Sequence, residues 1–176
     1  MASLAIRTYG DPVLKRRASK IEDIDGKVAK LAEVMVETMH DAPGVGLAAP
    51  QVGVQKRLFV YDVNDEPLVV VNPAISDSRG EWEYEEGCLS VPGLSYRITR
   101  PKEVHLTGYD LDGNEVSIEA DELLARVFQH EVDHLDGILL VDRLEPDHRR
   151  EALRVLRERT LGLNGAEEPG PRRSRL

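Results

Sequence analysis

The sequence contains a single cysteine, Cys88, among its 176 residues. One thiol cannot form a disulfide within the chain, which fits a protein of a reducing cytosol. In such a protein a lone thiol is a metal ligand, a nucleophile or a core residue. No apolar run reaches membrane-spanning length, and the first seven residues lack a signal-peptide core. We therefore expect a cytoplasmic protein without a membrane partner. An organelle form is the alternative, since a transit peptide could have been removed.

The composition is that of an ordinary folded protein, with 41% apolar and 31% charged residues. Internal repeats and domain linkers are lacking, which predicts one folded domain at residues 1–161. From residue 162 to residue 176 the composition turns to Gly, Pro, Glu and Arg. Such a segment cannot bury enough apolar surface to order itself, and we expect a disordered tail there.

The net charge of −9 argues against specific DNA binding. The charge is unevenly distributed along the sequence. The segment from Arg143 onward contains nine arginines and six acidic residues, a local charge of +3, which leaves −12 for the remainder. A basic helix from Arg149 to Arg159 suggests a docking element for a polyanion. A solvated helix with a loose tail is the more ordinary interpretation.

Apolar periodicity predicts both helices and strands. Residues 24–40 are typical of an amphipathic helix with Asp25 as its N-cap, and a second helix is expected from about Asp121 to just before Gly137. A third helix should run from Pro146 to about Thr160. Short apolar runs predict strands at 58–63, 68–71, 82–84, 95–99, 104–109 and 116–118, with a tight turn at 112–113.

The second predicted helix carries a metal-binding pattern, His130-Glu131-Val132-Asp133-His134. Residues four apart lie on one face of an α-helix, so both imidazoles can bind the same divalent cation. Glu131 can then act as general base toward a water molecule at the ion. We expect an α+β fold with antiparallel β-sheets packed around this central metal-binding helix, flanked by an N-terminal and a C-terminal helix.

A catalytic site of this kind needs a third protein ligand. One protease class places a third histidine six residues after the second, where this chain has Leu140. Another class uses a downstream glutamate, and Glu145 and Glu151 are available in a stretch that looks solvent-facing. The third candidate is Cys88, whose thiolate suits zinc or ferrous iron. A small buried core residue is the alternative for a lone cysteine.

A glycine-rich segment lies far upstream, at Gly44-Val45-Gly46-Leu47-Ala48-Ala49-Pro50-Gln51. Its backbone could pair with an extended peptide, and the Gln51 amide could donate to an oxyanion. An ordinary connection between a helix and a strand is the alternative interpretation.

The three segments together resemble peptide deformylase. That family has a Gly-φ-Gly-φ-Ala-Ala-Pro-Gln loop, a Glu-Gly-Cys-Leu-Ser segment and a Gln-His-Glu-φ-Asp-His-Leu-x-Gly helix, where φ is an apolar residue. All three motifs occur here in the same order and without a mismatch, at residues 44–51, 86–90 and 129–137. The resemblance covers about residues 6–161, and it makes the predicted domain a deformylase-like catalytic domain.

The resemblance implies a metal-dependent hydrolase that removes the N-formyl group from the initiator methionine of nascent polypeptides and releases formate. Cys88, His130 and His134 would bind one divalent ion, Fe²⁺ in the cell, with Zn²⁺, Ni²⁺ or Co²⁺ able to replace it. Glu131 would carry the proton. Gln51 and the backbone N–H of Leu89 would stabilise the oxyanion.

The resemblance also implies substrate contacts. The backbones of Val45 and Gly46 would pair with the peptide, and the methionine side chain would lie near Tyr84, Leu123 and Val127. Core packing is the alternative for Leu123 and Val127. Glu86 and Arg100 match a charged pair that orders the site. Partners would be N-formylmethionyl nascent peptides and, through the basic C-terminal helix, the ribosome. A zinc endopeptidase and a catalytically silent binding protein are the rival functions.

Overall fold

The computed structural model describes residues 2–162 and residue 176. Over these residues the helices are α1 (Gly26–Asp41), α2 (Glu122–Leu135) and α3 (Pro146–Thr160), and short 3-10 turns are η1 (Pro12–Lys15), η2 (Ala49–Val52) and η3 (Leu140–Arg143). The strands are β1 (Gly46–Ala48), β2 (Leu58–Tyr61), β3 (Leu68–Arg79), β4 (Trp82–Cys88), β5 (Val91–Arg100), β6 (Glu103–Tyr109) and β7 (Glu115–Asp121). The predicted tail lies outside the described residues apart from its two ends, 162 and 176.

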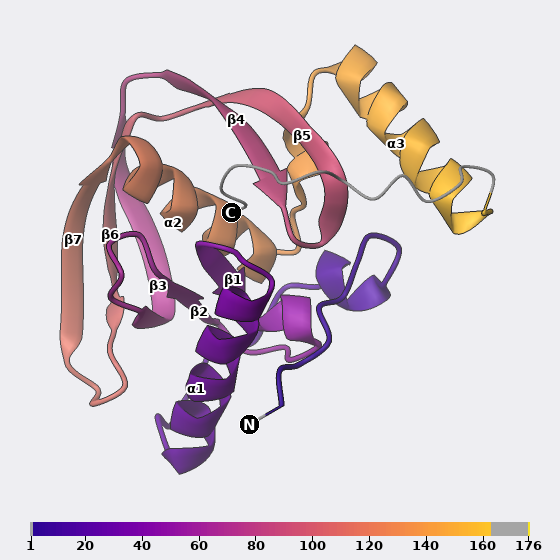
Figure 1. Cartoon of the computed structure of the whole chain (residues 1–176). Helices are drawn as coiled ribbons and strands as arrows, with labels where there is room; N and C mark the ends of the chain where they lie inside the picture. The colour runs from indigo at the N-terminus through magenta and orange to yellow at the C-terminus, as the bar shows by residue number, and fades with distance from the viewer. Residues whose placement is uncertain (1, 163–175) are drawn as a thin grey trace.

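Two antiparallel sheets enclose the central helix. Five strands pair in the order β1-β2-β3-β6-β7, while β4 and β5 form a separate two-stranded sheet. Figure 1 shows α2 between these sheets, with α1 beside β1 and β2 and α3 projecting away near β5. The predicted α+β class, with antiparallel sheets around the motif helix, is confirmed.

The apolar face of α2 forms the centre of the molecule. Phe128 and Leu135 are fully buried, and the Phe128 ring lies 6.0 Å from Phe59 and 5.1 Å from Tyr61, measured between ring centroids. Burying side chains of this size contributes about 1.5–3 kcal/mol each. The last residue, Leu176, is also buried in this cluster. The helix that bears the motif is thus fixed by core packing on one side.

The ends of two helices follow the sequence signals. Asp25 accepts hydrogen bonds from the backbone N–H groups of Lys27 and Val28, both at 3.0 Å, so it caps α1 as predicted. Gly137 has φ +75° just after α2, and a Cβ there would lie 2.6 Å from the Lys15 carbonyl oxygen. Only glycine allows both the left-handed turn and this close approach.

Several strands are longer than their apolar runs. β3 continues to Arg79, and most of its added residues are exposed, while β4 continues to Cys88 through an alternation of exposed and buried residues. Backbone pairing with β6 and β5 holds these extensions, so no apolar pattern is needed. β1, which pairs with β2, was not predicted as a strand. In the part of the chain that the structure describes, no helix is long and apolar enough to cross a membrane.

Candidate metal centre and active site

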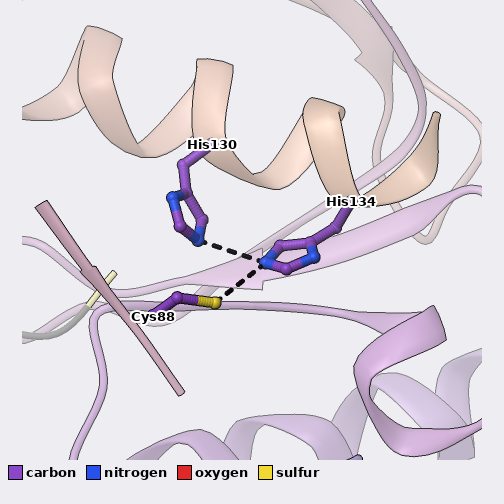
Figure 2. A group of neighbouring side chains, drawn as sticks. All are labelled: Cys88, His130 and His134. Atoms are coloured by element: carbon purple, nitrogen blue, oxygen red, sulfur yellow. Dashed lines mark hydrogen bonds between the residues drawn. The ribbon is translucent and has the colours of Figure 1, made fainter. Parts of the chain in front are cut away.

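Three side chains from two elements converge beneath α2. The potential ligand atoms of Cys88, His130 and His134 all lie within 4.8 Å of one another, and all three residues are buried. The Nε2 atoms of the two histidines are 3.1 Å apart, and Cys88 Sγ is 3.3 Å from His134 Nε2 (Figure 2). Among the described residues, this is the group of His, Cys, Asp or Glu side chains close enough to hold one ion.

The backbone explains why these atoms meet. His130 and His134 are one helical turn apart on α2, so their imidazoles point the same way. Cys88 ends β4, where the register against β5 shifts between Gly87 and Cys88. The chain turns there, and the Ser90 N–H lies 3.4 Å from the Cys88 sulfur as a donor. The strand end thus directs the sulfur toward the helix.

A buried carboxylate orients the first histidine. Glu86 Oε1 accepts a hydrogen bond from His130 Nδ1 at 2.7 Å, which leaves Nε2 directed toward the other ligands. Arg100 donates to both oxygens of Glu86, at 2.9 and 2.7 Å. Burial works to raise the pKa of Glu86, but the bonds and charges of His130 and Arg100 outweigh it and hold that pKa well below its usual value.

The two imidazoles differ electrostatically. Burial lowers the pKa of His134 well below its usual value, and the adjacent His130 lowers it further. Burial works in the same direction on His130, but Cys88 and Glu86 raise its pKa well above the usual value. A soft sulfur with two imidazole nitrogens is a donor set that suits zinc or ferrous iron, so the residues fit a divalent ion with one open position.

Glu131 lies in the same space without a protein partner. It is fully buried, and neither carboxylate oxygen has a hydrogen bond to any described group. Burial raises the pKa of Glu131 to about 7. A Cβ on Gly46 would lie 2.5 Å from Glu131 Oε1, so the β1 backbone passes directly beside this carboxyl group. An unpaired buried acid beside a candidate metal site is typical of a proton-transfer group.

Gln51 is held rigidly next to the sulfur. Its Oε1 accepts from the Ala48 N–H at 2.9 Å, and its Nε2 donates to Ser90 Oγ at 3.2 Å and approaches Cys88 Sγ at 3.9 Å. Gln51 is fully buried in η2, directly after β1. The amide N–H₂ group is thus fixed at the edge of the three-ligand cluster, where it can donate to a bound oxygen.

Comparison with known proteins fits this geometry. A sequence profile of the polypeptide deformylase family matches residues 3–150. The peptide deformylase of Acidothermus cellulolyticus is 49% identical over 158 residues, covering 90% of this chain and 88% of that protein. The chain belongs to the polypeptide deformylase family. It is therefore an enzyme, a metal-dependent hydrolase that removes the N-formyl group from the initiator methionine of nascent polypeptides.

Solved deformylases have the same fold. The crystal structure of a peptide deformylase from Legionella pneumophila superposes with a TM-score of 0.85 at 41% identity, covering 94% of this chain and all of that one. The deformylase from Ehrlichia chaffeensis in complex with actinonin gives a TM-score of 0.86 at 37% identity, with 90% and 98% covered.

The other ligand candidates lie elsewhere in this deformylase. Glu145 and Glu151 are exposed, as their sequence context suggested, and Leu140, which stands where one protease class has its third histidine, is buried in the apolar cluster around η3. Leu89, next to Cys88, is buried against the cluster that includes α1. A cavity of about 530 Å³ opens on another side of α2, and none of the three candidate ligand residues lines it.

The predicted substrate-contacting residues fall into two groups. Val127 is buried in the central cluster of the deformylase fold, and Val45 and Leu123 pack against that cluster. Tyr84 lies on β4 and stacks on Trp82 with ring centroids 4.9 Å apart. Core packing and a role in a methionine pocket are compatible for Val127, because Val127 lies about one helical turn before His130 on α2.

Sequence reasoning missed several charged residues of the site. Arg126 is fully buried, and Asp133 accepts from both Arg100 and Arg143. Ser90, which contacts Gln51, was not singled out either. The available signal was spacing: Arg126 precedes His130 by four residues, and His134 follows by four. Residues at four-residue steps share one face of a helix, so Arg126 lies on the face that carries His130 and His134 and not on the solvent-facing side.

Proposed function

We propose that Cys88, His130 and His134 bind the catalytic divalent ion of this deformylase. The observation that carries the proposal is the convergence of their three ligand atoms in a buried space. The hydrogen bond from His130 Nδ1 to Glu86 supports it, because such a bond fixes a histidine with Nε2 free for a metal.

We propose that Glu131 moves the proton during hydrolysis. The three ligand residues would hold a divalent ion, which would supply Lewis acidity and lower the pKa of a water molecule toward neutral. Glu131 accepts the proton of the water that attacks the formyl carbon. It then delivers that proton to the amine nitrogen as the C–N bond breaks, giving formate and a free N-terminus. A pKa of about 7 allows both directions of transfer.

Gln51 and the Leu89 backbone N–H stabilise the oxyanion that forms on the carbonyl oxygen. The support for Gln51 is its position, since Nε2 lies 3.9 Å from Cys88 Sγ and donates to Ser90 Oγ, while Oε1 accepts from the Ala48 N–H. A preorganised donor of this kind is worth about 10²–10³ in rate.

The substrate peptide binds beside β1, with Val45 and Gly46 as its backbone partners. β1 is an edge strand in the described five-stranded sheet, so its outer edge can take an additional strand. The methionine side chain lies against Tyr84, Leu123 and Val127. These residues come from the two elements, β4 and α2, that also carry the ligands.

We propose Fe²⁺ as the ion in the cell, with Zn²⁺, Ni²⁺ or Co²⁺ able to replace it. A thiolate with two imidazoles binds all four ions. Anaerobic purification followed by metal analysis and a formate-release assay tests this assignment. Iron in stoichiometric amount with full activity is the expected result, and an active preparation free of iron would contradict it.

The ligand and base assignments are tested by two substitutions. Glu131→Gln should bind metal normally but release less than a few per cent of the wild-type formate from formyl-Met-Ala-Ser. Cys88→Ala should lose stoichiometric metal. Glu145→Gln, an exposed change outside the site, is the matched control. Retained metal in Cys88→Ala would move the third ligand elsewhere.

We also propose that the basic face of α3 docks on the ribosome. Ala152 and Leu156 fix α3 to the protein, while Arg150 and Arg157 are exposed. Arg150→Glu with Arg157→Glu should weaken salt-sensitive co-sedimentation with ribosomes and leave the formate-release rate on a free peptide unchanged. Co-sedimentation at the wild-type level would refute the docking face.

The cellular and domain assignments are proposals as well. A cytoplasmic location fits a substrate that is a nascent chain. Residues 1–161 would form the catalytic domain, to which 162–176 is appended. Truncation after residue 161 also removes Leu176 from the central buried cluster, so it should lower the free energy of unfolding while metal binding and formate release are retained. Fractionation of the native cells checks the location.

A further inference from the structure

One face of β4 lies along one face of α2, and the two faces match row by row. Side chains at every second residue of β4 point the same way, which places Trp82, Tyr84, Glu86 and Cys88 on one face. On α2, residues at four-residue steps share a face, namely Arg126, His130 and His134. Contacts in three successive rows join these faces.

The first two rows involve the ligands. Cys88 Sγ lies 3.3 Å from His134 Nε2, and Glu86 Oε1 lies 2.7 Å from His130 Nδ1. The third row is formed by Arg126, whose Nη1 donates to Glu86 Oε2 at 3.0 Å. Its guanidinium carbon lies 5.5 Å from the Trp82 ring centroid and 5.9 Å from that of Tyr84. Arg126 therefore occupies the row immediately beyond the ligand pair.

Arg126 also bonds to the backbone of both strands of the small sheet. Its Nη1 donates to the Ile98 carbonyl on β5 at 3.0 Å, and its Nη2 donates to the Trp82 carbonyl on β4. The side chain is fully buried. A single guanidinium on the two-histidine helix thus binds the Cys88 strand, its partner strand and the carboxylate that orients His130.

We infer that Arg126 is a positioning residue, which sets the register of the Cys88 strand against the helix that carries His130 and His134. The inference rests on the ligand set proposed above. Through Glu86 it orients His130, and through the Trp82 carbonyl it fixes the start of the strand that ends in Cys88. The hydrogen bonds of Arg126 go to Glu86 and to the Ile98 and Trp82 carbonyls, and not to Cys88, His130 or His134, so its effect would reach the metal indirectly through Glu86 and the β4 backbone.

The chemistry of the contacts requires arginine. Three acceptors in different directions need a planar fork with several N–H groups, whereas lysine offers one compact ammonium group. The flat guanidinium also lies against the paired rings of Trp82 and Tyr84, where a cation is attracted to the ring faces. Arg126→Lys keeps the charge but loses the fork, and Arg126→Met keeps the length but loses both.

The test uses the full chain loaded with Co²⁺, because the absorption of a cobalt–thiolate bond reports directly on Cys88 and the ligand geometry. Metal affinity is measured by competition with a chelator, folding by circular dichroism, and KM and kcat by formate release. Arg97→Met is the matched control, since Arg97 lies on β5, is 77% exposed and pairs with Glu83.

The expected order of Co²⁺ affinity is wild type and Arg97→Met, then Arg126→Lys, then Arg126→Met. Loss of an outer hydrogen-bonding partner weakens metal binding by about 10–100-fold, and we expect Arg126→Met in that range with an altered cobalt–thiolate band. In a cycle with Glu86→Gln the losses should be non-additive, because Arg126 acts partly through Glu86.

Several results would overturn the inference. A folded Arg126→Met with wild-type Co²⁺ affinity and spectrum would show that the register does not depend on Arg126. If that variant does not fold, Arg126→Lys with a wild-type spectrum would show the same. Failure of both variants to fold would make Arg126 a residue of the fold alone. Retained Co²⁺ in Cys88→Ala would instead refute the ligand set itself.

Discussion

Replacing Glu131 with glutamine should stabilise the metal-free protein while it abolishes the reaction. Glu131 is fully buried and its carboxylate oxygens have no partner among the described groups. A buried ionised carboxylate without a partner destabilises the folded state. Glutamine has nearly the same shape and carries no charge, so it removes this penalty. It also removes the group proposed to carry the proton.

The magnitude follows from the pKa. Burial raises the pKa of Glu131 from 4.5 to about 7 in the folded protein. Below pH 4.5 the group is protonated in the folded and the unfolded state, and the penalty is absent. Between these values the unfolded chain ionises first, so stability falls as pH rises. Since each pKa unit corresponds to about 1.4 kcal/mol, the penalty reaches about 3 kcal/mol at pH 8 and about 1 kcal/mol at pH 5.

Urea unfolding of the chelator-treated protein measures this difference. The gain in unfolding free energy of Glu131→Gln over the wild type should grow by about 2 kcal/mol between pH 5 and pH 8. Adding Zn²⁺ should shrink the gain, because a nearby cation favours the ionised carboxylate of the wild type. Glu145→Gln, an exposed change, is the control. A gain that stays flat with pH would refute the view that Glu131 is held in a desolvated site.

Three further outcomes are expected. Gly46→Ala should fold, but its kcat/KM should fall about 10²-fold, because the new Cβ would lie 2.5 Å from Glu131 Oε1 and displace the carboxyl group. Formate release at the wild-type rate would contradict this role of the Gly46 position. Gln51→Leu should lower kcat by about 10²–10³ at unchanged metal content, and an unchanged kcat would remove Gln51 from the oxyanion site. Zn²⁺ affinity, measured by chelator competition, should weaken about tenfold for each unit by which the pH is lowered. The reason is that Cys88 and Glu86 raise the pKa of His130, so a proton competes with the ion for the imidazole. An affinity that does not change with pH would exclude this competition.

Local signals in the sequence predicted the parts of the site that are local in the chain. The spacing of His130 and His134 needs only a helix, and the Asp25 cap and Gly137 marked helix ends correctly. Cys88 was harder, because nothing in its own segment distinguishes a ligand from a core residue. The fold supports the ligand assignment, because it places Cys88 Sγ 3.3 Å from His134 Nε2.

Pairing across the chain could not be predicted in the same way. Arg126 is fully buried, although arginine in a helix is ordinarily solvent-facing. Its partners are Glu86, 40 residues earlier, and the carbonyls of Trp82 and Ile98. Likewise, most of the second half of β3 is exposed, and its strand is held by pairing with β6. These features depend on contacts between distant segments, which apolar periodicity does not encode.

The pairing of the charged side chains explains why this polar network is compatible with a stable core. Glu86 and Asp133 carry two negative charges, and the buried Arg100 and Arg126 together with the exposed Arg143 carry three positive ones, all joined by hydrogen bonds. Ions taken out of water destabilise a protein unless they are paired, and here each carboxylate has at least two partners. Glu131 is outside this network, so the site keeps one acid free to exchange a proton.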